Sequence, residues 1–343
     1  MNEKDLNTWK RLYEAAELLK TQKPWELLDY YDFVTVERKD GKSSAYCTVL
    51  GDLLKSHTIS VYETEDALYD IIYELDNEDI PWHQATRYNN CLNVIFGDRD
   101  LLLPSDREMI DLVGQKYRGR KAWTLFRSLE KGRMDKMLNV EEAARLTDVI
   151  QQLSEAFADI RARELVLSEE NDETILRRYD RKTKKWETLV APLNDKPKIL
   201  ISFSVTDEIL MKQLKRRKKL ETVMEIDVMH HIISTAIDEN GGSLLERFAM
   251  CCEAGNPSDP YLIEVLDPED EEVPMILNIL VGYIEEFGRP GEIRLRDDMI
   301  EISIKEICEE LGIRTSVSGS LPAIDAVFES ATGLDMLGKI DEE

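Results

Sequence analysis

The chain has 343 residues, and 69 acidic against 44 basic residues give it a formal net charge of −25 at pH 7. Hydrophobic residues make up 43% and charged residues 33%, which is typical of globular domains and excludes a mainly disordered chain. The acidic balance argues against a general nucleic-acid-binding protein, because neutralising phosphates requires clustered Lys and Arg. At roughly 100–200 residues per domain, the length predicts two or three domains.

Residues 1–118 predict an N-terminal α/β module. A helix is expected over Leu6–Leu19, where apolar residues recur at helical spacing, and the pattern then changes to that of strands. Three strands are followed by a helix with an acidic first turn, a fourth strand and a second helix. Asp40 and Gly41 form the turn of the first hairpin. The predicted strands are Phe33–Val36, Ala45–Leu50, Thr58–Tyr62 and Leu92–Phe96.

Residues 119–198 have a different character and predict a connecting segment. Asn139 and Glu142 have the spacing of a capping box at the start of a long amphipathic helix. A hairpin is expected next, with strands over Thr174–Tyr179 and Trp186–Val190 around the basic turn Arg181–Lys185.

Residues 199–343 predict a C-terminal α/β module. Three strands, with a turn at Asn240-Gly241, are followed by a helix that contains Pro274 in its first turn and ends at Gly288. A fourth strand, a helix that begins at Asp298, and a last strand follow. The predicted strands are Thr222–Ile233, Ser243–Cys252, Tyr261–Leu266, Glu292–Leu295 and Ile313–Val317.

The fold class expected from these elements is mixed α/β (α+β-like), with two β-β-β-α-β-α modules joined by a helical segment. Each module has acidic residues between its third strand and the next helix, and again after its fourth strand. We interpret this as a repeated topology. Common descent and convergence on a simple layered arrangement both remain open.

The sequence resembles an uncharacterised bacterial family built of two adjoining domains of unknown function. The resemblance to the first domain is carried by Trp25, Asp32-Phe33, the run from Tyr46 to Gly51, and Val61-Tyr62 ahead of an acidic helix. The resemblance to the second domain is carried by the helix that contains Glu141 to Leu146 and by the run from Phe287 to Asp297. The resemblance implies an architecture and no activity.

The order of elements in the C-terminal module also resembles a ribonuclease-H-like sheet, in which the fourth strand lies beside the first. Such enzymes hold two divalent metals between an Asp on strand one and another after strand four. Asp227 lies within the first strand, and Asp297 or Asp298 follows the fourth. Asp325 or Glu329 would supply a third carboxylate. The alternative is that these are ordinary acids: Asp227 shares a strand face with Glu225, as a solvent-facing residue would.

A second candidate metal site involves a His pair and a Cys pair. A two-residue turn at Asn240-Gly241 would place His230 opposite Cys251 on the paired strand. One His and one Cys make only half of a tetrahedral site. The alternative is that His231 and Cys252 point to the opposite face from their neighbours and that the buried thiols contribute only to the core.

Three further runs have both ordinary and functional interpretations. The basic run Lys212–Lys219 is either a solvated helix face or a surface for an anionic partner. The acidic run Asp267–Glu272 lacks the pattern of a calcium loop and is expected to begin a helix. Ser316–Ser320 is either a phosphate-binding loop or a plain connection.

The sequence contains no complete catalytic set. It has no P-loop, no dinucleotide-binding glycine motif and no nucleophile elbow. Five cysteines, without a CxxC pair, and the absence of a signal peptide or transmembrane segment predict a reduced cytoplasmic protein. The cysteines are Cys47, Cys91, Cys251, Cys252 and Cys308.

The leading hypothesis is a non-enzymatic binding or regulatory protein without a cofactor, whose partner is an unknown protein or small molecule. The alternative is a divergent ribonuclease-H-like nuclease or phosphodiesterase that uses Asp227 and Asp297 with Mg²⁺ or Mn²⁺. Edge strands of the sheets also make a homodimer conceivable.

Overall fold

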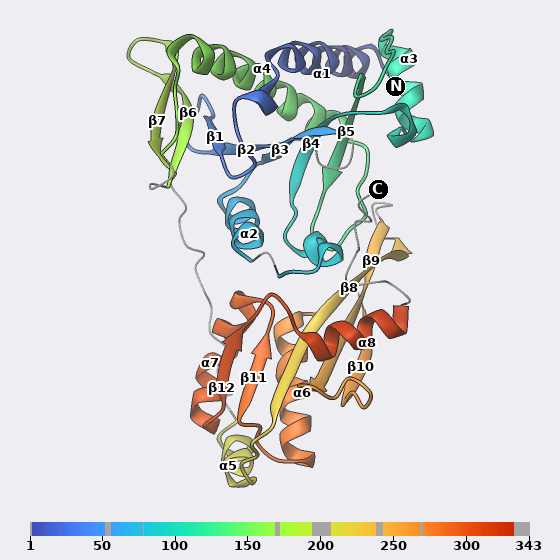
Figure 1. Ribbon diagram of the computed structural model, residues 1–343, viewed down its shortest axis with the longest axis vertical. Helices are drawn as coiled ribbons and strands as arrows, with labels where there is room; N and C mark the ends of the chain where they lie inside the picture. The colour runs from blue at the N-terminus through green and yellow to red at the C-terminus, as the bar shows by residue number, and fades with distance from the viewer. Residues whose placement is uncertain are drawn as a thin grey trace. The chain divides into compact units, whose positions relative to one another are not determined.

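The computed structural model describes residues 2–51, 56–77, 79–168, 172–193, 207–237, 243–267 and 270–332; side chains are described except at 82, 83, 232–237 and 332. By their internal contacts the residues divide into two compact units. The first contains Met1–Ile72, Asn89–Lys131 and Asp135–Pro197. The second contains Tyr73–Tyr88, Gly132–Met134 and Lys198–Glu343. Each unit is built on its own sheet (Figure 1).

The first unit has a seven-stranded sheet with the order β5-β4-β3-β2-β1-β6-β7. Strands β1 to β5 form an antiparallel meander, β6 pairs parallel with β1, and β7 returns antiparallel. The strands are β1 (Phe33–Glu37), β2 (Ser44–Leu50), β3 (His57–Tyr62), β4 (Cys91–Gly97), β5 (Trp123–Leu129), β6 (Glu173–Asp180) and β7 (Lys185–Pro192).

Two long helices, α1 (Glu3–Gln22) and α4 (Val140–Arg163), lie side by side on this sheet (Figure 1). Apolar residues of both helices recur at helical spacing and share one core with the strands; Leu12, Leu146 and Phe126 are all fully buried there. The predicted capping box of α4 is present, because Asn139 Oδ1 accepts the Glu142 N–H and the Glu142 carboxylate accepts the Asn139 N–H. The remaining helices in this sequence region are η1 (Pro24–Glu26), α2 (Glu65–Asp76), η3 (Trp82–Arg87), η4 (Arg99–Leu101) and α3 (Pro104–Val113).

The second unit has a five-stranded sheet with the order β10-β9-β8-β11-β12. Its first three strands are antiparallel, and β11 pairs parallel with β8 on one side and with β12 on the other. The fourth strand therefore lies beside the first, which is the ribonuclease-H-like order that the sequence predicts. The strands are β8 (Val223–Ile237), β9 (Ser243–Glu253), β10 (Leu262–Leu266), β11 (Glu292–Leu295) and β12 (Arg314–Val317).

Helices cover both faces of the second sheet. On one face the core is shared with α5 (Glu208–Arg216), α6 (Glu272–Glu286) and α7 (Asp298–Leu311). On the other face α8 (Pro322–Thr332) packs against Met229, Met250 and Cys252. Among the described residues no helix is both long enough and apolar enough to span a membrane.

The mixed α/β class and the two β-β-β-α-β-α successions are confirmed. The strand order, however, is not repeated: the fourth strand lies beside the third in the first sheet and beside the first in the second. The predicted connecting segment, 119–198, supplies three strands of the first sheet and the helix α4 that packs on it.

Candidate functional site

Asp227, the predicted carboxylate of strand one, lies in the first half of β8 with a side chain that is only 1% exposed. The prediction that Asp227 and Glu225 face solvent together is wrong, because α8 covers this face of the sheet and buries both. Glu225 instead accepts hydrogen bonds from the N–H groups of Ala323 and Ile324 in the first turn of α8, at 2.8 and 3.2 Å. Its negative charge there stabilises the positive end of the helix.

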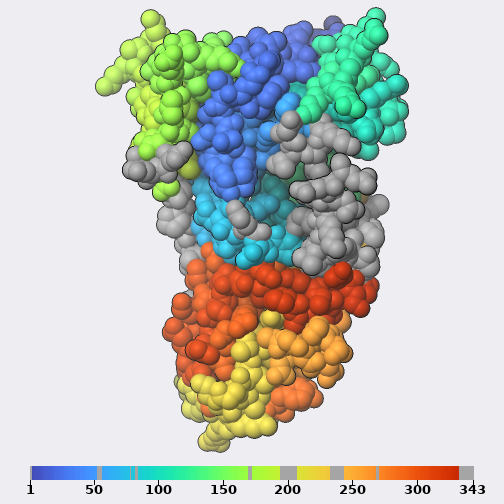
Figure 2. Space-filling view, viewed as in Figure 1, coloured from blue at the N-terminus to red at the C-terminus, as the bar shows by residue number. Residues whose placement is uncertain are grey.

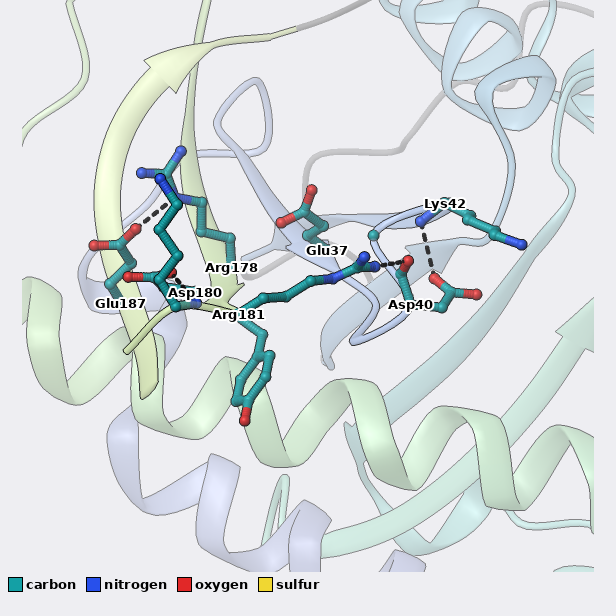
Figure 3. A pocket seen from close by; sticks show the side chains of 10 residues that line it. Glu37, Asp40, Lys42, Arg178, Asp180, Arg181 and Glu187 are labelled. Carbon is teal, nitrogen blue, oxygen red and sulfur yellow. Dashed lines mark hydrogen bonds and ion pairs between the residues drawn. The ribbon is translucent and has the colours of Figure 1, made fainter. Parts of the chain in front are cut away.

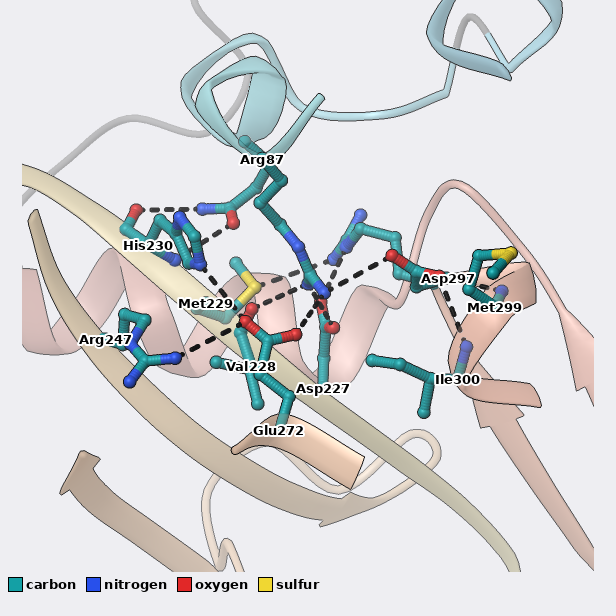
Figure 4. Close-up of polar contacts among 12 residues, drawn as sticks. Arg87, Asp227, Val228, Met229, His230, Arg247, Glu272, Asp297, Met299 and Ile300 are labelled. Carbon is teal, nitrogen blue, oxygen red and sulfur yellow. Dashed lines mark hydrogen bonds and ion pairs between the residues drawn. The ribbon is translucent and has the colours of Figure 1, made fainter. Parts of the chain in front are cut away.

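Both oxygens of the Asp227 carboxylate are bound by arginines (Figure 4). Arg87 Nη1 donates to Oδ1 at 2.7 Å, and Arg296 Nε donates to Oδ2 at 2.7 Å. Arg296 directly follows β11, and its side chain is fully buried. Its other nitrogens donate to the Gly319 carbonyl and to the carboxylate of Asp325, the predicted third carboxylate, on α8.

Arg87 brings three carboxylates together around one guanidinium group (Figure 4). Its Nη2 lies 3.0 Å from Glu272 Oε2 and 3.6 Å from Asp297 Oδ2, and its Nη1 also donates to the Val228 carbonyl at 2.7 Å. Glu272 begins α6. Asp297 is the N-cap of α7, where its side chain accepts the N–H groups of Met299 and Ile300. We call Arg87, Arg296, Asp227, Glu272 and Asp297 the arginine–carboxylate cluster.

The segment that carries Arg87 is attached to the second sheet through its backbone and side chains. The Gln84 side-chain amide donates to the His230 carbonyl and accepts the His230 N–H, both at 3.0 Å. It thus makes the pair of hydrogen bonds that a residue of a neighbouring strand would make. The Tyr73 hydroxyl donates to the Arg296 carbonyl at 2.7 Å. These contacts fix the direction from which Arg87 approaches Asp227.

The cluster controls the ionisation of its acids. Burial raises the pKa of Glu272, but Arg87, His230 and Arg247 outweigh that effect and lower the pKa to about 2. For Asp297 burial dominates, so its pKa is raised despite the attraction of Arg87. Burial alone would lower the pKa of Arg87, but Glu272 and Asp227 raise it well above its usual value. Arg87 is therefore a permanent cation at the centre of the cluster.

These residues do not fit a divalent metal of the kind that a ribonuclease-H-like fold implies. Such a metal requires carboxylate oxygens with accessible lone pairs, whereas guanidinium groups bind both oxygens of Asp227 and one oxygen of Asp325. Within the described ranges, no group of three or more His, Cys, Asp or Glu side chains is arranged to hold a metal ion. Glu329, the other predicted third acid, is half-buried on α8.

The predicted pairing of His230 with Cys251 is wrong. His230 lies opposite Arg247, and Cys251 lies opposite Ile226. The register of the hairpin shifts twice beyond His231, so a simple two-residue turn gives the wrong partner; the turn itself, 238–242, lies outside the described residues. His230 Nε2 instead lies 3.5 Å from Glu272 Oε1, and burial lowers the pKa of its imidazole. All five cysteines are buried thiols, with no disulfide among them.

Some side chains of each of the other runs that the sequence singles out have structural partners. In the basic run, Lys212 pairs with Glu208 and Lys215 pairs with Glu310, while Met211 and Leu214 of the same helix are buried. Of the acidic run, the Asp270 carboxylate accepts the Asp267 N–H, and α6 begins at Glu272; residues 268 and 269 lie outside the described ranges. In the loop Ser316–Ser320, Ser316 is hydrogen-bonded to Glu292, and the Ser318 hydroxyl donates to the Ser320 carbonyl.

Comparison with protein families accounts for most of the chain. Residues 9–178 match the family described as "Domain of unknown function (DUF7309)", and residues 210–331 match "Domain of unknown function (DUF6930)". The chain contains both domains. Asp227, Glu272, Arg296 and Asp297 lie in the DUF6930 domain, whereas Arg87 falls within the DUF7309 range of the sequence and belongs by its contacts to the second unit.

Other comparisons add no function to these two domains. No curated protein matches the chain. The HTLV-2 integrase catalytic core domain in complex with magnesium, in its dimeric and trimeric forms, aligns with a TM-score of 0.23 at 13% and 14% identity, over 34% of this chain and 68% of the integrase chain. The simian T-cell lymphotropic virus intasome in complex with PP2A regulatory subunit B56 gamma aligns with a TM-score of 0.23 at 18% identity, over 34% and 40% of the two chains. Alignments at this score carry no argument about the chemistry of this chain.

Proposed function

We propose that this protein is a non-enzymatic binding or regulatory protein in which the DUF6930 domain has a ribonuclease-H-like strand order without the corresponding metal chemistry. The observation that carries the proposal is the double engagement of Asp227, whose two oxygens are each 2.7 Å from an arginine nitrogen. The guanidinium groups supply the positive charge that metal ions supply in a two-metal site.

The energetics of burial favour this arrangement over metal binding. Arg296 is fully buried and the Arg87 side chain is 4% exposed, so neither cation is able to leave Asp227 for bulk water without unfolding the surrounding structure. Removing one partner of a buried ion pair costs about 3–5 kcal/mol. A divalent metal would have to displace both arginines from Asp227 and leave their charges uncompensated.

The proposal is tested by metal binding and hydrolysis with the full chain. Calorimetric titration with Mg²⁺ and with Mn²⁺ is expected to show no saturable binding up to millimolar metal, and RNA–DNA hybrid, single-stranded RNA and duplex DNA are expected to remain intact. Saturable metal binding together with cleavage that Asp227→Asn abolishes would overturn the proposal. Glu285→Gln, at an exposed acid on α6, is the control for the loss of one carboxylate.

One observation favours the nuclease alternative: Asp227 and Asp297 both face the guanidinium of Arg87, so the two predicted carboxylates do converge. The alternative is then an enzyme held inactive by Arg87. The variant Arg87→Met, checked for folding by circular dichroism, tests it. Mn²⁺-dependent cleavage by Arg87→Met, lost again in Arg87→Met/Asp227→Asn, would support the alternative; an intact substrate with folded Arg87→Met would reject it.

Five buried thiols fit a reducing compartment, and we place the protein in the cytoplasm. Its partner is a protein or small molecule, and self-association into a homodimer is part of the proposal. Sedimentation of the purified chain over a range of concentrations tests the dimer, and a constant monomer mass would exclude it.

A further inference from the structure

Two turns of the first unit leave its sheet at the same end. β1 and β6 are parallel neighbours, with Val36 paired to Arg177, so the turn after β1 (residues 38–43) and the turn after β6 (residues 181–184) lie next to each other. Figure 2 shows the β6–β7 hairpin (yellow-green) at the molecular surface.

A concave pocket of about 690 Å³ lies between the two turns (Figure 3), and we call it the turn pocket. This volume falls within the range of small-molecule sites, roughly 300–1,000 Å³. Residues of both turns and of the adjoining strand ends line it, including Glu37, Asp40, Lys42, Arg178, Arg181 and Lys182.

Arg181 joins the two turns across the pocket (Figure 3). Its guanidinium donates to the Asp40 carbonyl and lies against Gly41, whose φ is +58°. A Cβ atom at position 41 would come within 2.9 Å of Arg181 Nη2, so a larger residue there would make the guanidinium shift. The remaining N–H groups of the exposed Arg181 side chain make no ion pair with any carboxylate of the described residues.

Cationic side chains outnumber carboxylates at this end of the sheet, although the whole chain carries a net charge of −25. Within the described chain, exposed cations that make no ion pair lie in both turns and at the first residue of β7: Lys39, Lys42, Arg181, Lys182, Lys184 and Lys185. Three of the four acids that line the turn pocket are already engaged. Asp40 accepts the Lys42 N–H, Asp180 accepts from Lys182 and Thr183, and Glu187 pairs with Arg178.

We propose that the turn pocket binds the phosphate group of a small phosphorylated molecule. A guanidinium fork with nearby ammonium groups is the arrangement that recognises phosphate. The pocket limits the ligand to a compact anion, because a long polyanion would extend over a surface whose overall charge repels it. Glu37 in the lining provides an acceptor for a hydroxyl or amino group of the same ligand.

Calorimetry in a phosphate-free buffer tests the proposal, with inorganic pyrophosphate, ribose 5-phosphate and a 20-nucleotide single-stranded RNA as separate probes. At least one small phosphate is expected to bind saturably, and Arg181→Ala/Lys182→Ala is expected to weaken that binding at least tenfold. Arg181→Lys retains the charge but loses the fork, so an intermediate affinity is expected. The control Lys10→Ala/Arg11→Ala removes the same two residue types from an exposed face of α1 and is expected to leave binding unchanged.

Three outcomes would overturn the proposal: no saturable binding of either small phosphate at millimolar concentration, binding of the RNA alone, or equal weakening in the control variant. The site lies in the first unit and does not involve the arginine–carboxylate cluster. Failure here therefore leaves the proposed function of the second unit untouched, and the reverse also holds.

Discussion

The two units contain the same succession of elements but differ in which strands are neighbours. This difference determines which partners their acidic side chains contact. In the first sheet the interior of β1 carries no acid, since its only acidic residue, Glu37, is the last of the strand, and the buried Thr35 makes a neutral hydrogen bond to Thr174 on β6 at 2.9 Å. In the second sheet the same position beside a parallel strand brings Asp227 of β8 next to Arg296, which follows β11. Element order alone does not specify which side chains meet; strand order does.

The acids after the fourth strands show the same contrast. Asp98, after β4, accepts the Lys121 N–H at 2.6 Å and thereby stabilises the loop that precedes β5. Asp297, after β11, faces Arg87 within the arginine–carboxylate cluster. The first unit does contain a buried ion pair, between Arg127 and Asp106, but there both oxygens of the carboxylate accept hydrogen bonds from the same arginine. The following variants measure how far the two units differ.

The largest expected effect is at Asp227. Asp227→Ala should lower the free energy of unfolding of the second unit by about 3–5 kcal/mol, because two buried arginines lose their shared partner. Asp106→Ala should cost about 1.5–3 kcal/mol, since Arg127 keeps Asp135 at 3.2 Å. Urea unfolding followed separately in each unit gives both values. Equal losses would mean that the cluster is no stronger than a single buried pair.

A smaller effect is expected at Glu272, and it depends on pH. The folded-state pKa of about 2 lies below the usual value of 4.5, so this carboxylate stabilises the fold above pH 4.5 and loses that contribution as the pH falls towards 2. Glu272→Gln should therefore be about 2 kcal/mol less stable than the natural chain at pH 6, with the difference vanishing near pH 2.

Thermal unfolding of both chains between pH 2 and pH 6 measures this difference. Asp297 has a raised pKa and hence the opposite slope, so Asp297→Asn is the control and should not reproduce the Glu272→Gln profile. A difference that stays constant with pH would show that the ionisation of Glu272 is not what stabilises the fold.

The two helix caps provide a third comparison. Glu225→Ala should cost about 1–2 kcal/mol, because the N–H groups of Ala323 and Ile324 lose a buried charged acceptor. Asn139→Ala, at the half-exposed start of α4, should cost about 1 kcal/mol. Glu225→Gln retains an acceptor oxygen and should recover part of the loss. A Glu225→Ala variant no less stable than Asn139→Ala would remove the energetic distinction between the two caps.

The smallest effect is expected on α5. Lys212→Ala removes an exposed pair with Glu208 and should change stability by less than about 0.5 kcal/mol. Chemical denaturation in low and high salt measures it. A larger loss of stability would indicate that the basic run has a role beyond forming a solvent-exposed helix face.

Much of the fold was predictable because its signals are local. The boundaries of β11 and the start of α7 agree with the prediction, since Asp297 and Asp298 follow a short strand of alternating charged and apolar residues and Gly312 stops the helix. The capping box at Asn139 is equally local. The hairpin register at His230 was not predictable. Irregularities in the strand pairing change which residue of β9 lies opposite His230, and the residue pattern gives no sign of them.

The candidate site was predictable only in part. Asp227 and Asp297 follow from strand order, but the residues that determine their state do not. Arg296 leaves one signal, a basic residue at the end of a buried strand and next to an acid. Arg87 leaves none, because 140 residues separate it from Asp227 and nothing in its own surroundings indicates a buried partner.

The position of Tyr73–Tyr88 in the second unit has a consequence for folding and for dissection of the protein. The ribosome makes this segment more than a hundred residues before the strand it contacts, so the β8 sheet completes its charge pairing only through contacts of high sequence separation, which slow folding. A fragment cut between the two family ranges would contain Asp227, Glu272 and Asp297 without Arg87. Such a fragment would be less stable, and these three carboxylates would lack the guanidinium that they share in the full chain. Metal binding measured on the fragment would therefore not be a property of the native chain.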